Sequence, residues 1–321
     1  MGLNLSMADI RPKKDVSLAL HTVFKIGGVA RYFYEARSPE ELIASADWAL
    51  HYKLRFFVLG AGSNTLAHEN GFFGLVVKPI YDDVRALGNS IHVGVGAMMP
   101  RVASYARTEG LTGFEWAVGI PGTIGGSIRG NAGCFGKSMA DVIDSVLAYN
   151  AIFKRIKKLS HNDCAFAYRD SKFKYRPELI ILSAVLGLRA ETEGIIVATM
   201  LEHSAHRVAT QAIGSKCAGC VFKNVPWDSL SFAGRQKLLR RFPSLERFKN
   251  QTHIPTAFII DELGLKGYSI GGAAISEKHA NFFINNDGAS SHDLMILISH
   301  CKEFVHRKTG LLLEEEIQHL A

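Results

Sequence analysis

Along this chain, segments whose apolar residues have helical spacing alternate with short apolar runs typical of strands. The segment 38–41, Ser-Pro-Glu-Glu, has the form of a capping box with proline in the first turn, and the apolar positions that follow share one helical face. Runs 55–59, 75–78 and 91–95 are short and apolar, as buried strands are. The pattern therefore predicts helices and strands mixed from the first fifty residues onward.

The same mixture continues to the end of the chain. The run 179–188 reads as another buried strand. Further helices are predicted at about 100–110, 195–210, 228–242 and 291–310. In the last of these, Ser291 and Asp293 mark the start and Gly310 marks the end. We therefore assign the chain to the α+β class.

Size and composition set broad limits on domains and partners. The chain has 321 residues, of which 47% are hydrophobic, which is enough for two or three domains. The segment 189–194 is charged and contains glycine, so we place a domain junction there. The net charge of +7 favours anionic ligands, but no Lys/Arg block with interleaved aromatics predicts nucleic-acid binding.

Compartment and membrane association follow from the same sequence. No apolar run approaches the ~20 residues of a membrane helix, and the first residues lack the basic and apolar regions of a signal peptide. Five cysteines at irregular spacing indicate a reducing compartment. We expect a cytoplasmic protein that is not inserted in a membrane and that is a monomer or a weak oligomer.

Glycine is concentrated in two segments. Seven glycines fall within 114–136, which has no helical or strand period, and a second glycine loop at 59–64 follows a predicted strand. Clustered backbone N–H groups without side chains cradle phosphates and other anions. Two such loops suggest a dinucleotide held at two points. The spacing is not Gly-x-Gly-x-x-Gly, so a flavin-binding architecture other than the Rossmann fold is indicated.

Eight short sequence strings follow one another along the chain. They are Leu-Gly-Ala-Gly-Ser-Asn (59–64), Gly-Ile-Pro-Gly-Thr-Ile-Gly-Gly (119–126), Gly-Asn-Ala-Gly (130–133), Tyr-Arg-Asp-Ser (168–171), Val-Phe-Lys-Asn (221–224), Leu-Lys-Gly (265–267), Ile-Gly-Gly-Ala (270–273) and His-Ala-Asn-Phe (279–282). Together they resemble the UDP-N-acetylenolpyruvoylglucosamine reductases, also called UDP-N-acetylmuramate dehydrogenases. The resemblance runs from about Thr22 to Ile317.

The resemblance implies a fold and a reaction. The implied fold has a two-subdomain FAD-binding module of the flavin-oxidase (PCMH) type at 1–190, divided at about 80. A substrate domain at 191–321 follows, and its C-terminal segment returns to the active site. In the implied reaction NADPH reduces FAD, which then reduces the enolpyruvyl group of the UDP-sugar to give UDP-N-acetylmuramate for peptidoglycan. Only a short stretch separates Arg169 from the strand at 179, so the chain resembles the shorter subgroup without a tyrosine-bearing insertion.

Three residues match the family's catalytic positions. The resemblance implies that Arg169 binds the substrate carboxylate and stabilises developing charge, a task that suits a guanidinium. Glu316, the last of three consecutive glutamates, is implied in proton delivery or charge placement. Cys220 stands where members commonly carry the proton-donating serine. A thiol is the stronger acid, so we predict Cys220 as the general acid, with sensitivity to alkylation promoted by Lys216 and Lys223.

Cys217 and Cys220 also form a Cys-x-x-Cys pair. A zinc site would need two more ligands at compatible spacing, and Cys164 and Cys301 are distant single cysteines. A redox pair would need a thioredoxin-like context. We therefore predict no metal site and leave a regulatory disulfide as a side hypothesis.

The resemblance also implies the binding residues. FAD would be held by Gly60, Ala61, Gly62, Ser63, Asn64, Gly122, Thr123, Gly125, Gly126, Ser127, Asn131 and Gly133. The substrate would be held by Lys223, Asn224, Lys266 and Asn281, although a structural turn role for Asn281 stays equally open. Asn64 stands where related oxidases carry a flavin-linking histidine, so we expect non-covalent FAD.

Three alternatives remain at this point. An FAD oxidase of the same fold would share the glycine loops, but it would not need the combination of Arg169, Cys220 and Glu316. A flavin-binding protein without turnover would explain the departure from serine at 220. A basic nucleic-acid binder would show steeply salt-dependent affinity for DNA or RNA.

Overall fold

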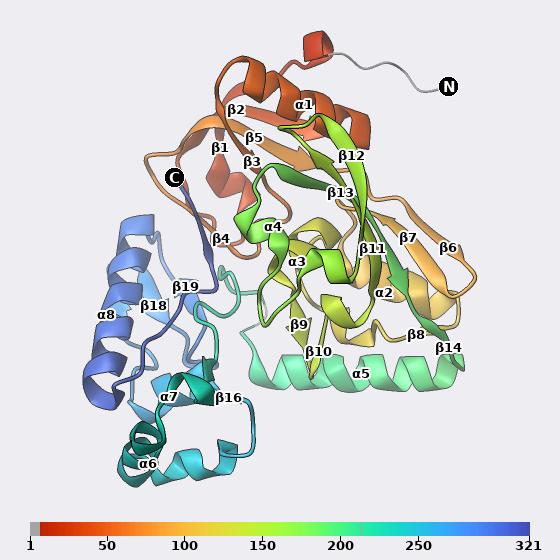
Figure 1. Ribbon diagram of the computed structural model, residues 1–321. Helices are drawn as coiled ribbons and strands as arrows, with labels where there is room; N and C mark the ends of the chain where they lie inside the picture. The colour runs from red at the N-terminus through yellow and green to blue at the C-terminus, as the bar shows by residue number, and fades with distance from the viewer. Residues whose placement is uncertain (1–6, 213) are drawn as a thin grey trace.

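The computed structural model describes residues 7–212 and 214–321. A four-stranded sheet built from the first eighty residues has the order β1-β2-β5-β3 (Figure 1). Its strands are β1 (Lys13–Ser17), β2 (Val29–Ala36), β3 (Arg55–Val58) and β5 (Phe72–Pro79). β5 pairs in parallel with β2 and β3, while β1 is antiparallel to β2. The parallel pairing follows from α1 (Pro39–His51), which supplies the crossover between β2 and β3.

The start of α1 shows why the predicted cap forms. The Ser38 hydroxyl accepts a hydrogen bond from the Glu41 backbone N–H at 3.2 Å. The Glu41 carboxylate accepts from the backbone N–H of Arg37 at 2.8 Å, one residue before the position that a capping box uses. Leu42 and Ala46 are buried on the inner face of the helix, as the apolar pattern predicts.

A five-stranded antiparallel sheet follows, with the order β12-β11-β13-β7-β6. Its strands are β6 (Val84–Leu87), β7 (Ser90–Gly94), β11 (Ile143–Asn150), β12 (Arg155–Ser160) and β13 (Leu179–Gly187). α2 (Met99–Thr108) contacts this sheet at β6. Buried residues of both sheets, such as Val77 and Leu182, belong to one hydrophobic cluster. The two subdomains therefore share a core.

The glycine-rich segment is more regular than its sequence predicts. Its middle forms a short helix, α3 (Ile124–Gly130), which is followed by the hairpin of β9 (Gly133–Cys134) and β10 (Lys137–Ser138). Thr123 caps the helix by accepting from the Gly126 N–H. A Cβ at Gly125 would lie 2.9 Å from the Cβ of Val95. The absence of side chains thus lets this helix approach the second sheet, and the expectation of an irregular segment was wrong here.

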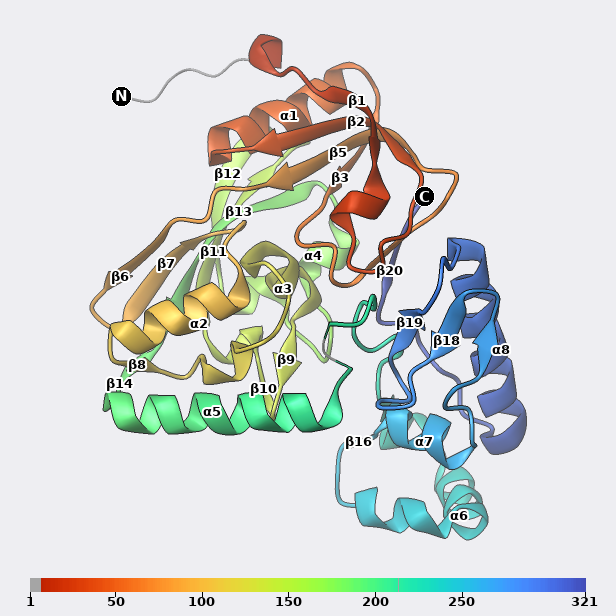
Figure 2. The ribbon, with the colours of Figure 1, turned by 180° about the vertical axis from the view of Figure 1, so that it is seen from behind.

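The predicted junction at 189–194 is followed by α5 (Glu193–Thr210). This helix lies along the outside of the N-terminal region, where it contacts α2 and the 3-10 turn Glu115–Ala117 (Figures 1 and 2). Only Ile196 of its side chains is buried. The second small sheet of this region pairs β8 (Leu111–Thr112) with β14 (Arg189–Ala190).

A second hydrophobic cluster is built mainly from the C-terminal region and also includes Phe24, Ile26 and Leu66. It contains α6 (Phe232–Arg241), α7 (Thr256–Glu262), α8 (Ser291–Thr309), the pair β15 (Val225–Pro226) and β16 (His253–Ile254), and the sheet β17 (Ser269–Ile270), β18 (Ala273–Ile275) and β19 (Phe283–Asn285). The helix α8 begins after a Ser290–Asp293 capping box and ends at Gly310, whose φ is 79°. These ends agree with the predicted helix.

The end of the chain returns to the first glycine loop. β20 (Gln318–Leu320) pairs in parallel with β4 (Thr65–Ala67), which directly follows that loop (Figure 2). The last segment therefore touches both halves of the molecule. Within the described residues, no helix is both long enough and apolar enough to cross a membrane.

Candidate active site

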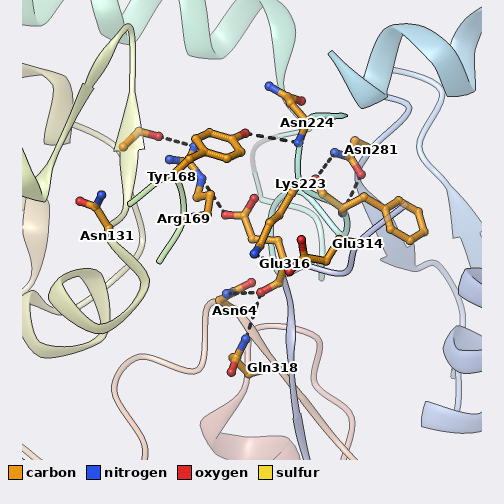
Figure 3. A network of polar contacts seen from close by, with 12 residues as sticks. Asn64, Asn131, Tyr168, Arg169, Lys223, Asn224, Asn281, Glu314, Glu316 and Gln318 are labelled. Atoms are coloured by element: carbon orange, nitrogen blue, oxygen red, sulfur yellow. Dashed lines mark hydrogen bonds and ion pairs between the residues drawn. The ribbon is translucent and has the colours of Figure 1, made fainter. Parts of the chain in front are cut away.

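A cleft of about 310 Å³ lies where the two glycine loops meet the C-terminal region. Arg169, Cys220 and Glu316 all line it, although they come from three distant segments of the chain. The structure thus brings together the three residues that the sequence predicted as catalytic. Figure 3 shows the polar network around Arg169 and Glu316.

The glycine loops form one continuous wall of this cleft. A Cβ at Gly60 would lie 2.5 Å from the Thr123 hydroxyl, so the loops can touch only because that position has no side chain. Within the described part of the chain, the backbone N–H groups of 60–63 donate no hydrogen bond. Unpaired N–H groups at a cleft are suited to an anionic ligand.

Cations reinforce this wall. Arg129, Lys174 and Arg207 line the cleft together with Arg169, and Glu316 is its one lining carboxylate among the described residues. Burial lowers the pKa of the Arg129 guanidinium and of the Lys174 ammonium, and the nearby Lys223 adds to the effect on Lys174. The wall therefore has an excess of positive charge that a pyrophosphate would neutralise.

A smaller hollow of about 140 Å³ adjoins the cleft and shares Val58, Gly60 and Gly126 with it. Phe56 and Phe173 are among its apolar lining residues. A site with an anion-binding centre and an apolar pocket beside it matches the chemistry of a dinucleotide, which has a pyrophosphate between aromatic ends. The residues present therefore fit the predicted FAD.

Eleven of the twelve predicted FAD residues line one of these two spaces. The cleft is lined by Gly60, Ala61, Gly62, Ser63, Asn64, Gly122, Thr123, Gly126, Ser127 and Gly133, and the smaller hollow by Gly125. Asn131 is different because it is buried and its amide is occupied by the backbone. It donates to the Ala167 carbonyl at 2.7 Å and accepts from the Ala140 N–H at 3.0 Å. This geometry favours positioning of the Arg169 turn over contact with a ligand.

Arg169 occupies a tight turn in an unusual conformation. Ala167 and Asp170 exchange both backbone hydrogen bonds, and Arg169 between them has a φ of 53°. A left-handed arginine is uncommon and persists where its surroundings hold it. Here the Arg169 Nη2 donates to the Gly133 carbonyl at 2.7 Å, and the Lys174 ammonium donates to the backbone carbonyl of Arg169 at 2.5 Å. The turn therefore aims the guanidinium at the cleft.

Glu316 is the partner of Arg169. The Nε of Arg169 lies 2.9 Å from Oε1 of Glu316. Burial raises the pKa of the Glu316 carboxyl, while Arg169 and Lys174 oppose that rise. The main chain of Glu316 is also fixed, since its N–H donates to the Val221 carbonyl at 2.7 Å and its carbonyl accepts from the Asn64 amide at 3.0 Å. The first glycine loop is thus joined directly to the backbone that carries the Glu316 carboxylate.

The two neighbouring glutamates face elsewhere. Glu314 pairs with Lys223 at 2.5 Å, and Glu315 pairs with Lys302 at 3.0 Å. A hydrogen bond from His319 is the main cause that lowers the pKa of Glu315 to about 2. Neither residue lines the cleft. Glu316 is therefore the member of the acidic run that is available for chemistry.

Cys220 precedes a segment that is clamped on both sides. The Asn281 side chain accepts from the Phe222 N–H at 3.0 Å and donates to the Phe222 carbonyl at 2.8 Å. On the other side, the Lys223 N–H donates to the Glu314 carbonyl at 2.9 Å. Asn281 is 1% exposed. Because both polar atoms of its buried amide bond the backbone of Phe222, the geometry favours the structural role over contact with substrate.

The environment of the Cys220 thiol suits an acid. Burial, with a smaller contribution from Glu316, raises the pKa of the Cys220 thiol to about 12 despite the opposing Arg169. The expected activation by Lys216 and Lys223 is wrong, because neither lysine is among the groups that lower this pKa and Lys223 pairs with Glu314. A thiol that stays protonated at neutral pH can donate a proton but is a poor thiolate nucleophile.

Cys217 and Cys220 form no disulfide in the part of the chain that the structure describes. All five cysteines are free, and Cys217 is buried with the Ser215 hydroxyl 3.4 Å from its sulfur. Among the described residues, no group of three or more His, Cys, Asp or Glu side chains could hold a metal ion.

The other predicted substrate residues lie outside the lining of the cleft. The N–H of Asn224 donates to the hydroxyl of Tyr168, the neighbour of the lining residue Arg169, at 3.3 Å (Figure 3). The Asn224 side chain accepts from the Thr256 N–H at 3.1 Å. Lys223 lies beside it, whereas Lys266 pairs with Asp261 at 2.6 Å. The cavity-lining Arg129, Lys174, Arg207 and Gln318 were not predicted. Arg129 could have been found from its place inside the glycine-rich segment.

Comparisons with known proteins agree with this geometry. A family model described as an FAD binding domain matches residues 30–154. The model of the UDP-N-acetylenolpyruvoylglucosamine reductase C-terminal domain matches residues 211–320. Together they confirm the predicted fold class and the predicted cofactor.

Whole-chain relatives extend the match. The UDP-N-acetylenolpyruvoylglucosamine reductase of Caldicellulosiruptor bescii is 36% identical over 308 residues, which cover 95% of this chain and 89% of the relative. That of Prochlorococcus marinus is 35% identical over 97% of this chain and 99% of its own. The crystal structure of the Thermus caldophilus enzyme superposes with a TM-score of 0.76 at 28% identity, covering 97% of this chain and 99% of that one.

Proposed function

Because the chain belongs to the UDP-N-acetylenolpyruvoylglucosamine reductase family, whose members are FAD-dependent oxidoreductases, we propose that it reduces UDP-N-acetylglucosamine enolpyruvate to UDP-N-acetylmuramate with NADPH. This reaction belongs to peptidoglycan synthesis, and the free cysteines are consistent with a cytoplasmic location. The observation that carries the proposal is the convergence of Arg169, Cys220 and Glu316 on one cleft beside both glycine loops.

Each catalytic residue has a role that its environment supports. When bound and reduced by NADPH, FAD would supply the hydride that reduces the enolpyruvyl double bond. The Arg169 guanidinium is oriented to hold the substrate carboxylate and to stabilise the negative charge that develops beside it. The Cys220 thiol then gives its proton to the carbanionic carbon, which completes the reduction. Glu316 fixes the guanidinium and helps to keep the thiol protonated.

The binding groups divide between the two walls of the cleft. The unpaired N–H groups of 60–63, together with Arg129, would hold the FAD pyrophosphate non-covalently. Lys223 and Asn224 are the best-placed predicted residues for the UDP part of the substrate, because Asn224 bonds to Tyr168, the neighbour of the lining residue Arg169, and Lys223 is next to it. Lys266 would reach substrate only if its ion pair with Asp261 opened. Asn281 and Asn131 act by holding the backbone around the site.

An anaerobic half-reaction experiment tests the proposal. The FAD-loaded protein is reduced with NADPH in the absence of oxygen, and UDP-N-acetylenolpyruvoylglucosamine is then added while flavin absorbance is followed. Rapid reoxidation by this substrate, with UDP-N-acetylmuramate as product, is expected. Bleaching without reoxidation would favour an FAD oxidase of the same fold or a flavin protein without turnover. Failure to bind FAD would overturn the proposal entirely.

A further inference from the structure

The turn between β11 and β12 presents large apolar side chains to solvent. Ile152 and Phe153 are 67% and 63% exposed, and Ile156 at the start of β12 is 53% exposed. Turns of this kind usually carry Gly, Asn, Asp, Ser or Pro, which are polar or conformationally permissive. Exposed apolar residues that cluster at one place mark an interaction site more often than scattered ones do. We call residues 151–158 the hairpin tip.

The hairpin tip is held rigidly. The Asn150 side chain accepts hydrogen bonds from the backbone N–H groups of Ile152 at 3.1 Å and Phe153 at 3.0 Å. Below the tip, Asn150 pairs with Arg155 in the ladder of β11 and β12. The two apolar side chains are therefore held outward by a fixed backbone, so their exposure is a built property of the turn.

Cations surround these apolar residues. Lys154, Arg155, Lys157 and Lys158 fall in the same eight residues and are exposed. The Arg155 guanidinium lies over the Phe153 ring at 5.0 Å, and Lys154 is 4.0 Å from Asp47 of α1. Asp47 is the only carboxylate that ion-pairs with the tip among the described residues. The net charge of this surface is therefore strongly positive.

We propose that the hairpin tip is a docking site for an anionic lipid surface. A convex tip with apolar side chains ringed by Lys and Arg suits the boundary between headgroups and acyl chains, where apolar groups enter and cations remain at the phosphates. An acidic protein would be expected to meet a groove or a flat face. Two of the three exposed apolar side chains are isoleucines, which offer no stacking surface to nucleic-acid bases, and the one aromatic ring, Phe153, already lies under the Arg155 guanidinium. The charge and the shape together favour lipid.

The tip is placed so that docking would leave the cleft open. The β11–β12 hairpin rises beside α1, away from the C-terminal region, in both views of the molecule (Figures 1 and 2). None of residues 151–158 lines the cleft within the described chain. The protein would thus work at the membrane surface without insertion. This inference is independent of the reaction proposed above.

Vesicle sedimentation of the FAD-loaded protein tests the proposal. Binding to phosphatidylglycerol/phosphatidylcholine vesicles is expected at low salt, with little binding to pure phosphatidylcholine and loss at high salt. The variant K157E/K158E should lower the partition coefficient by about 25-fold or more, since each cation near an anionic surface contributes about fivefold. The variant I152S/F153S should lower it by about tenfold or more.

Matched controls are available elsewhere on the surface. L87S removes an exposed apolar residue from the β6–β7 turn, and K14E/K237E makes the same charge change away from the tip. The vesicle partition coefficient of both controls should lie within about twofold of that of the parent protein. Absence of binding to anionic vesicles, equal binding to neutral vesicles, or equal loss in the controls would overturn the proposal. So would tip-dependent binding to nucleic acid with no vesicle binding.

Discussion

The guanidinium of Arg169 and the carboxylate of Glu316 meet at 2.9 Å, and they join a turn of the N-terminal region to the last segment of the chain. Each group is fixed independently, Arg169 through Gly133 and Glu316 through Val221. The pair therefore closes the active site across the two halves of the molecule. It also explains how a single cleft can combine residues so far apart in sequence.

Arg169→Lys should lower kcat/KM by about 10²- to 10³-fold, because an ammonium cannot hold a carboxylate and the Gly133 carbonyl with the same planar geometry. Steady-state kinetics measure the change. Arg176→Lys is the matched control, since Arg176 is an exposed residue nearby that pairs with Glu178 outside the cleft. Equal effects of the two substitutions would contradict the role given to Arg169.

Lys174→Met should shift the acidic limb of the pH–activity profile to higher pH. The Lys174 ammonium lowers the pKa of the Glu316 carboxyl against the opposing effect of burial, so its removal lets that pKa rise further. The ionised Glu316 that pairs with Arg169 would then be lost at a higher pH than in the parent. A pH profile of kcat/KM measures this shift, and Lys172→Met should leave the limb in place. A shift toward lower pH would contradict the electrostatic account.

Asn281→Ala should lower the free energy of unfolding by about 2–4 kcal/mol, because both backbone groups of Phe222 lose their partner. Urea unfolding of the protein without substrate measures this effect. Asn250→Ala, at an exposed position, should change it by less than about 0.5 kcal/mol. A variant of unchanged stability with raised KM would instead restore Asn281 to the substrate site.

Gly62→Ala should weaken FAD binding by about tenfold or more. Gly62 has a φ of 67°, and a Cβ there would overlap the carbonyl oxygen of His21, so the first glycine loop must shift. Flavin content and fluorescence titration measure the loss. Gly88→Ala is a control for backbone strain alone, because Gly88 has a φ of 58° with open space around it. Equal FAD affinity in the two variants would show that the loop does not cradle the cofactor.

Local signals in the sequence were sufficient to predict the ends of α1 and α8. The ends of α1 and α8 follow from Ser38, Asp293 and Gly310, because caps and left-handed glycines act within a single turn of chain. The helix α3 was missed because glycine and serine have low helix propensity. Its stability depends on the Thr123 cap and on close packing against Val95, and neither is visible as a period.

The sequence predicted only part of the site, because the roles of some residues depend on contacts between distant segments. Arg169 lies in one of the eight strings, Cys220 directly precedes another, and Glu316 was identified as the last of three consecutive glutamates. The cleft contains all three. Lys174 could not be separated from solvated lysines, since its role depends on the Arg169 carbonyl that it reaches. Asn281 was found from its motif, but its role was not, because a motif does not reveal whether an amide faces a ligand or a backbone.

Replacement of the proposed proton donor, Cys220, is the most direct test of the account. Single-turnover reoxidation of the NADPH-reduced enzyme by UDP-N-acetylenolpyruvoylglucosamine should be slowed about 10²- to 10⁴-fold in Cys220→Ala, because the thiol that we propose to protonate the carbanionic carbon is gone. Reduction by NADPH should stay unchanged, and Cys220→Ser should retain much of the reoxidation rate because a hydroxyl is still present. A Cys220→Ala enzyme that is reoxidised as fast as the parent would contradict the account.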